Sequence, residues 1–209
     1  MYDPEYKETS ELDENNSMQM SETESENTVS SWKKVRQFIW EVIQMIVITL
    51  ALYFGIDALI GRVQVESISM MDSIKPNELL MVSKYAYRNS DYHRGDVVVF
   101  HYPNDPTEDY IKRVVGIPGD VVEIRNRKVF VNGTQIDEPY IKESPEYNGT
   151  WVVPEQYLFV LGDNRNHSSD SHEWGYVPFE NVFGRAFLIY WPLNEFEILN
   201  RMDIVSASN

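Results

Sequence analysis

One long apolar run dominates the hydrophobic pattern of this chain. Phe38 to Ile60 spans 23 residues, and Val42 to Ile56 within it carries no charged side chain. At about 1.5 Å of rise per residue, a helix of that length reaches roughly 34 Å, which is enough to cross the apolar core of a bilayer. The pattern therefore predicts a membrane anchor within residues 31–61.

The flanks of this run predict its orientation. Lys33, Lys34 and Arg36 precede the run, whereas Arg62 alone follows it closely. Because basic residues are retained on the cytoplasmic side of a membrane, we expect the N-terminus to be cytoplasmic and the rest of the chain to lie outside.

Two other interpretations compete with a spanning helix. Glu41, Gln44 and Asp57 make the run less apolar, so a helix lying on the membrane surface is an alternative. Both charges lie near the ends, where they can reach the headgroups, and this favours the spanning helix. A cleaved signal peptide fits less well, because the apolar run is long and lies far from the N-terminus.

The segment before the anchor is acidic and polar. Met1 to Ser30 holds nine Asp or Glu residues against one Lys and few apolar residues. Such a composition cannot bury enough apolar surface to offset the loss of chain entropy, so residues 1–30 are predicted to be a disordered cytoplasmic tail. A solvated tail without a specific role is the favoured interpretation.

After Gly61 the pattern changes to short β-branched or aromatic segments bounded by Gly, Pro, Asn or Asp, as in strands. No long amphipathic helix is evident there, so residues 62–200 are predicted to form one mainly β domain, followed by a C-terminal tail at 201–209. "RNRK" and "VNGTQ" are typical of hairpin turns. The predicted strand segments are Gly95–Pro103, Tyr110–Asp120, Val121–Ile136, Tyr157–Asp163 and Gly184–Pro192.

Composition narrows the possible chemistry. The chain has no Cys, which excludes disulfides, thiolate metal sites and a cysteine nucleophile. Its formal net charge of −15 argues against a nucleic-acid partner.

Three serines in "VQVESISMMDSIKP" raise the question of a nucleophile. Ser67, Ser69 and Ser73 follow closely after the anchor, but a serine hydroxyl needs a neighbouring base. Histidine is the usual base, but no histidine of this chain stands in a recognisable triad context. The Gly-x-Ser-x-Gly motif that marks the nucleophile of many such triads is also absent. "HSSDSH" is open to interpretation as a fragment of a metal site or triad, although solvated loop histidines are favoured. The chain's histidines are His93, His101, His167 and His172.

A lysine is the other possible base. Neutral lysine accepts the serine proton only where an apolar, water-poor setting lowers its pKa. Lys112 in "DYIKRVVGIPGD" has such apolar neighbours, and strand periodicity places Lys112 and Arg113 on opposite faces. The spacing in the sequence does not show that Lys112 lies near a serine. A lysine on a β-strand usually lies at the surface, with its charge in solvent.

Four blocks in order, from Val42 onward, resemble bacterial type I signal peptidases. They are the apolar run, "SISM" with the extended "LLMVSK" after it, "RGDVVVF…YIKRVVGIPGD", and "GDNRNHSSDSHEWG". The third and fourth blocks are the specific ones. The resemblance implies a signal-peptidase and LexA-like complex β fold behind one membrane helix, and a serine endopeptidase with a Ser/Lys dyad.

Residue roles follow from the resemblance by motif position. It implies that Ser69 is the nucleophile and Lys112 the general base. The backbone N–H of Ser69 and the Ser67 hydroxyl are expected to bind the oxyanion. Ser168 is expected to orient the lysine. Asp163, Arg165 and Asp170 match polar residues that brace the site.

The chain departs from the family at several positions near the expected dyad. Asp72 stands where proline is usual, and a carboxylate there favours protonated Lys112, against its work as a base. Ser73 replaces threonine and is expected to be structural. Ile68 replaces a small or polar residue, and His172 replaces arginine. These changes suggest a divergent member with narrow substrate choice or low activity.

The leading function is therefore removal of signal peptides from exported preproteins, after small residues, at the membrane. No metal or organic cofactor is implied, and the bilayer and preproteins are the expected partners. An inactive assembly factor, for example for pili, is the alternative that Asp72 motivates. A LexA-like self-cleaving regulator shares the dyad, but the membrane run and the lack of DNA-binding helices argue against it.

Overall fold

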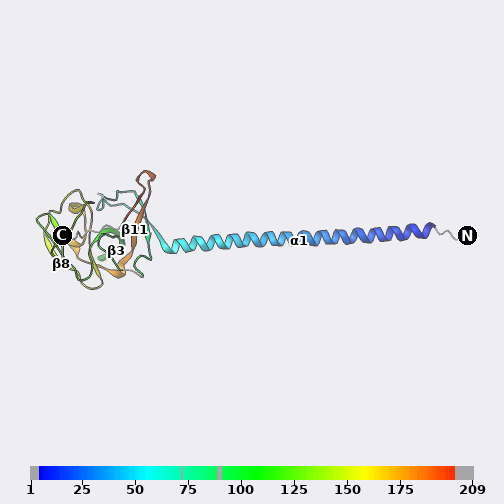
Figure 1. The fold of residues 1–209 in the computed structure, drawn as a ribbon, viewed down its shortest axis with the longest axis horizontal. Helices are drawn as coiled ribbons and strands as arrows, with labels where there is room; N and C mark the ends of the chain where they lie inside the picture. Colours follow the sequence, from blue (N-terminus) through cyan, green and yellow to red (C-terminus); the bar gives the residue numbers. More distant parts are fainter. Residues whose placement is uncertain (1–4, 72, 89–90, 201–209) are drawn as a thin grey trace. The chain divides into compact units, whose positions relative to one another are not determined.

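The computed structural model describes residues 5–71, 73–88 and 91–200, and the chain divides into the units Met1–Gly55 and Ile56–Asn209. Helix α1 (Glu5–Leu59) begins in the first unit and ends in the second (Figure 1). Its part Trp32–Leu59 is the one described helix that is long and apolar enough to cross a membrane. The large apolar side chains of this part are exposed in the described structure.

The acidic segment differs from its prediction. The composition predicts disorder over residues 1–30, whereas α1 begins at Glu5. No Pro or Gly occurs between Glu5 and Phe54, and Glu, Gln and Met have good intrinsic helix propensity, so nothing in the sequence ends the helix before the membrane run. Residues 1–4 and the predicted tail at 201–209 lie outside the described residues.

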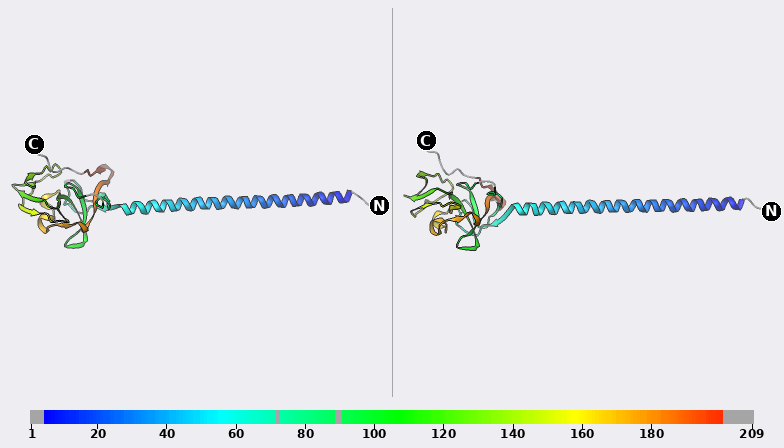
Figure 2. Two further views of the ribbon diagram at one scale, coloured as in Figure 1. Left: turned by 60° about the horizontal axis from the view of Figure 1, so that its bottom comes forward. Right: turned by 90° about the horizontal axis from the view of Figure 1, so that it is seen from below.

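The second unit is mainly β, as the sequence predicts, and consists of two antiparallel sheets. The larger sheet has the strand order β1-β2-β11-β3-β4-β9-β10, and β12 pairs with β11. Figure 1 labels β3 and β11 of this sheet, and Figure 2 shows the unit from two further sides. The strands are β1 (Ile60–Gln64), β2 (Leu79–Ser83), β3 (Val97–Tyr102), β4 (Asp105–Gly116), β9 (Tyr157–Leu161), β10 (Val177–Pro178), β11 (Val182–Trp191) and β12 (Glu197–Ile198).

The smaller sheet has the order β7-β6-β5-β8. Both predicted hairpin turns lie in it. Asn126 and Arg127 have φ of 51° and 61°, and Asn132 and Gly133 have φ of 51° and 81°. Two left-handed central residues define the type I′ turn, whose twist matches that of the flanking strands. The strands are β5 (Val121–Arg125), β6 (Lys128–Val131), β7 (Thr134–Gln135) and β8 (Gly149–Val152).

Short helices complete the described part of the second unit. They are α2 (Ser171–Trp174), η1 (Arg165–His167), η2 (Phe179–Asn181) and η3 (Leu193–Glu195). The unit thus has no long amphipathic helix in its described residues, as predicted. Both faces of the large sheet are covered, because separate apolar clusters pack around Val99 and around Val98 of β3. The second half of β4, from Ile111 to Gly116, is consequently buried at every position.

Candidate active site

Strand β4 carries two buried basic side chains that lie on opposite sides of the large sheet. Lys112 and Arg113 are adjacent on the strand and are 3% and 2% exposed. Since successive side chains of a strand point to opposite faces, the two meet different partners, as predicted. Lys112 Nζ donates to the hydroxyl of Ser69, whereas the Arg113 guanidinium contacts the Asp163 carboxylate.

Ser69 lies in a loop that is closed at its base. The Val65 N–H donates to the Glu78 carbonyl at 2.9 Å, and the Asn77 N–H donates to the Val65 carbonyl at 2.7 Å. Met70, next to Ser69, is fully buried in the core of the large sheet. These contacts hold the loop in place, although its described residues form no helix or strand.

The loop and β4 bring Ser69 and Lys112 together across 43 positions of sequence. Lys112 Nζ lies 2.7 Å from Ser69 Oγ and 3.0 Å from the carbonyl oxygen of Ile111. Ser69 is itself 6% exposed. The two groups are therefore within hydrogen-bond distance of each other in a nearly dry setting, which is the geometry that a nucleophile and its base require.

Burial lowers the pKa of Lys112 to about 8, against the opposing charges of Asp170 and Asp163, which raise it. Desolvation disfavours the ammonium form, and its effect exceeds that of the two carboxylates. Roughly a tenth of a lysine with this pKa is neutral at pH 7, compared with well under a thousandth of an ordinary lysine. Lys112 can thus act as a base near neutral pH.

The predicted helper serines occupy different positions. The Ser67 hydroxyl lies 3.1 Å from Ser69 Oγ. Ser168 is buried, but its hydroxyl has no hydrogen-bond partner among the described residues. The expected contact from Ser168 to Lys112 is therefore not made in this structure, where Nζ donates to Ser69 and Ile111 instead.

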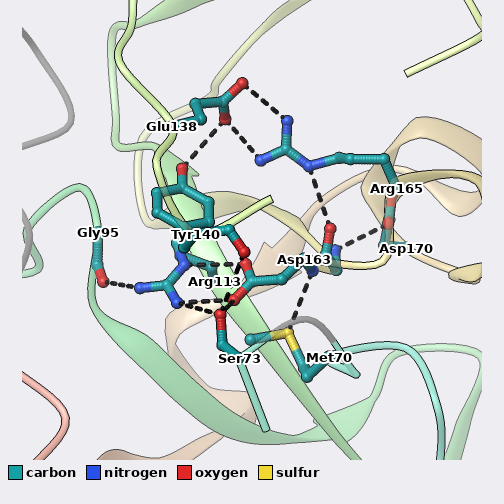
Figure 3. Close-up of polar contacts among 10 residues, drawn as sticks. Met70, Ser73, Gly95, Arg113, Glu138, Tyr140, Asp163, Arg165 and Asp170 are labelled. Carbon is teal, nitrogen blue, oxygen red and sulfur yellow. Dashed lines mark hydrogen bonds and ion pairs between the residues drawn. The ribbon is translucent and has the colours of Figure 1, made fainter. Parts of the chain in front are cut away.

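Asp163 holds a buried ion pair behind the serine loop (Figure 3). Its two carboxylate oxygens accept from Arg113 Nε at 2.9 Å and from a terminal nitrogen of Arg113 at 2.7 Å. The Ser73 hydroxyl donates to the same carboxylate at 2.6 Å, which supports the structural role expected of Ser73. Asp72, which precedes Ser73, lies outside the described residues.

Arg165 forms a second ion pair in the same region. Its Nε donates to the Gly162 carbonyl at 3.1 Å, and its guanidinium contacts the Glu138 carboxylate, to which the Tyr140 hydroxyl also donates (Figure 3). The sequence places Arg113 on the face opposite Lys112 but indicates no partner for it; its place beside Lys112 in a specific block is the signal that marks it. No sequence signal marks Glu138.

Asp170 links the start of α2 to the end of β9. One carboxylate oxygen accepts from the Gly162 N–H at 2.9 Å, and the other lies 2.6 Å from Nδ1 of His172. His172, which the resemblance places where an arginine is expected, therefore contacts a carboxylate. Within the described residues no group of three or more His, Asp or Glu side chains converges in the manner of metal ligands.

A cleft of about 800 Å³ opens beside Ser69 and Lys112. Its walls include Arg62–Ser67, which contains the end of β1, and Thr107–Lys112 of β4. In the described structure β1 pairs with β2 alone, and β4 pairs with β9 only from Arg113 onward, so both walls present unpaired strand edges. Such edges accept an extended peptide as an added strand.

The fold and site define a β domain, tethered by an apolar helix, with a Ser–Lys pair in a peptide-sized cleft. Residues 39–191 match the family model described as "Signal peptidase, peptidase S26". The chain belongs to this signal peptidase family, which confirms the resemblance.

Three relatives illustrate the family match. A signal peptidase I of Leptolyngbya laminosa is 38% identical over 174 residues, which cover 79% of this chain and 86% of the relative. A probable signal peptidase I-2 of Synechocystis sp. is 40% identical over 161 residues, covering 73% of each chain. A signal peptidase I of Bacillus caldolyticus is 35% identical over 179 residues, covering 78% of this chain and 94% of the relative.

Replacing Asp163 by alanine is expected to destabilise the second unit. The Arg113 guanidinium, 2% exposed, would lose the carboxylate that neutralises it. Leaving one buried charge unpaired costs about 3–5 kcal/mol. Chemical denaturation of the full chain in detergent measures the change. The exposed pair of Arg62 and Asp57 offers a matched control, since Arg62→Ala should change the free energy of unfolding by less than about 1 kcal/mol. Equal effects of the two substitutions would contradict this account.

Gly162 is a second position where a small change is expected to matter. A Cβ added there would lie 2.5 Å from the Ser69 carbonyl oxygen and would overlap the Ser168 hydroxyl. Overpacking of this kind costs about 1–3 kcal/mol, and here it also displaces Ser69. We expect Gly162→Ala to lower both the free energy of unfolding and the rate of preprotein cleavage. Adding Ser168→Ala removes the overlap with the hydroxyl and should restore part of the stability. A double variant no more stable than Gly162→Ala would show that the Ser168 hydroxyl is not what limits the space at Gly162.

Proposed function

We propose that this protein removes N-terminal signal peptides from exported preproteins, with Ser69 as the nucleophile and Lys112 as the general base. The observation that carries the proposal is the 2.7 Å contact between Lys112 Nζ and Ser69 Oγ, with both side chains buried beside an open cleft. Membership of the signal peptidase family and the relatives named signal peptidase I supply the reaction and the substrate class.

In the first half of the reaction, neutral Lys112 takes the proton from Ser69 Oγ as the oxygen attacks the scissile carbonyl carbon. The N–H of Ser69 and the hydroxyl of Ser67 bind the oxygen anion that forms. The tetrahedral species then collapses. The C–N bond breaks, protonated Lys112 returns its proton to the leaving amine, and the signal peptide remains as an ester on Ser69.

In the second half, Lys112 takes a proton from water, and the resulting hydroxide attacks the ester carbonyl. The C–O bond to Ser69 breaks, and the proton on Lys112 returns to Ser69 Oγ. The enzyme is restored, and the signal peptide leaves as a carboxylic acid that releases its proton to water. Atoms and charges balance without a metal or an organic cofactor.

The cleft supports binding of the substrate as an extended strand. Its two walls present unpaired edges from β1 and β4, and the Ser–Lys pair lies where the β4 wall ends. Small residues before the cut are proposed from the family resemblance, because shallow apolar pockets beside a dyad admit only small side chains.

The topology is proposed from the charges around the anchor. Trp32–Leu59 crosses the membrane with its basic flank, including Lys33 and Arg36, on the cytoplasmic side. The β domain is then extracytoplasmic, where it meets preproteins as they emerge from the membrane. The family resemblance remains the basis for proposing that Ser168 orients Lys112; its buried hydroxyl lies beside Gly162 and makes no hydrogen bond among the described residues.

The test is cleavage of a purified preprotein with an Ala-x-Ala site by the full-length protein in detergent. We expect one new N-terminus, located by sequencing the product immediately after the second alanine. Binding of several preproteins without any cleavage would instead favour the assembly-factor alternative.

A further inference from the structure

We propose that Asn164 is a positioning residue that aims the oxyanion-binding N–H of Ser69. This inference rests on the proposed function and adds a residue that the motif comparison assigned no role. It follows from how the segment after β9 contacts the main chain of the serine loop.

Two hydrogen bonds connect Asn164 to the peptides on either side of Ser69. The Asn164 side-chain Nδ2 donates to the carbonyl oxygen of Ile68 at 3.1 Å. The Asn164 backbone N–H donates to the carbonyl oxygen of Ser69 at 3.0 Å. One residue therefore holds both peptide groups that flank the proposed nucleophile.

Because the peptide bond is planar, the contact between Asn164 and the Ile68 carbonyl also sets the direction of the Ser69 N–H. The Ile68 carbonyl and the Ser69 N–H belong to the same peptide group, and in a trans peptide they point in opposite directions. Holding the Ile68 oxygen toward Asn164 therefore directs the Ser69 N–H away from it. Within the described residues this N–H donates to no protein acceptor, so it is available for an oxygen anion.

Asn164 is not alone in holding the Ile68 carbonyl, because the loop contributes a hydrogen bond of its own. The Met71 N–H also donates to the Ile68 carbonyl, at 3.0 Å, so loss of the Asn164 amide loosens the peptide without freeing it. Complete removal of an oxyanion donor lowers kcat by about 10²–10³-fold. Because the donor here is retained but less well aimed, we expect a smaller loss, on the order of 10- to 100-fold.

A purely structural role predicts a different outcome. Asn164 is only half-buried and its side-chain amide makes a single hydrogen bond in the described structure, so its loss should hardly affect folding. Its bond leaves the Lys112 environment unchanged, so the pH dependence of the rate should not move. Aiming of an oxyanion donor affects the transition state more than the bound substrate, so kcat should fall while KM stays constant.

The experiment compares Asn164→Ala and Asn164→Asp with Asn166→Ala in the full chain. Aspartate keeps the shape of asparagine, but its carboxylate cannot donate to Ile68. Asn166 is a matched control, because its amide holds Ser144 and Glu146, two residues outside the serine loop. We expect both Asn164 variants to lose about 10- to 100-fold in kcat with unchanged KM and melting temperature, and Asn166→Ala to retain wild-type kcat. The pH profile should stay unchanged in Asn164→Ala, the variant that adds no charge.

A double variant locates the effect in the oxyanion site. If Asn164 acts on the same anion as Ser67, the loss from Asn164→Ala and Ser67→Ala together will differ from the product of the two single losses. Independent losses would overturn the proposal, as would a loss expressed in KM or in melting temperature.

A measurement without turnover separates this inference from the proposed function. The carbonyl ¹³C resonance of Ile68 reports its hydrogen bonds, and it should move in Asn164→Ala but not in Asn166→Ala. If wild type fails to cleave preproteins, the proposed function fails, whereas an unmoved Ile68 resonance overturns the role of Asn164 alone.

Discussion

Replacing Ser69 by alanine is expected to abolish preprotein cleavage, with a loss in kcat on the order of 10⁶-fold, as for removal of the nucleophile from other serine proteases. The side chain that forms the ester is then missing, and Lys112 Nζ has no hydroxyl to deprotonate. The variant should still fold, because a serine hydroxyl is small and the loop is held by its backbone contacts and by Met70. Release of mature protein from a labelled preprotein gives the rate.

The matched control for this substitution is Ser144→Ala, which changes a serine whose hydroxyl takes no part in the described site. It should cleave at the wild-type rate. If Ser69→Ala retained more than about a hundredth of the wild-type rate, the oxygen that attacks the substrate would have to come from another group.

Replacing Lys112 by methionine should be about as severe, because methionine fills the same buried space without a base. Arginine should not rescue the activity, since its guanidinium stays protonated in proteins. For the wild type, only neutral Lys112 is competent, and burial lowers its pKa to about 8. The rate should therefore rise about tenfold per pH unit below pH 8 and level off above it.

The pH–rate profile of kcat/KM checks this expectation on a preprotein that carries no titrating group near its cleavage site. Its control is unfolding of the same protein at each pH, which must show a folded domain throughout. A rate that is constant between pH 6 and pH 9 would mean that Lys112 does not supply the base.

Local sequence patterns predicted much of the fold. The apolar run, the strand character of β3 and β11, and both hairpin turns depend on residues close together in sequence, such as Asn132 and Gly133. The helical acidic segment was not predicted, because composition indicates how much surface a segment can bury but not whether a neighbouring helix extends into it. The short strands β10 and β12 were missed because two residues carry no periodicity.

The candidate site, like the fold, was predictable from the sequence only in part. Ser69 and Lys112 were identified through a family resemblance, since a separation of 43 positions gives no spacing rule for their contact. The partner of Arg165 could not be predicted, because Glu138 comes from a loop after β7 whose path is fixed only by tertiary packing. The contacts of Asn164 were also inaccessible, since they go to backbone carbonyls that look alike in every sequence.

The measurement that tests the central claim most directly is the pKa of Lys112 itself. Full-length protein labelled with ¹³C at the lysine ε carbons can be titrated by NMR in detergent, and Lys112→Met identifies the resonance. The account predicts a midpoint of about 8, produced by burial. A midpoint near the ordinary lysine value of about 10.4 would contradict it, because Lys112 would then be protonated at the pH where it has to accept the serine proton.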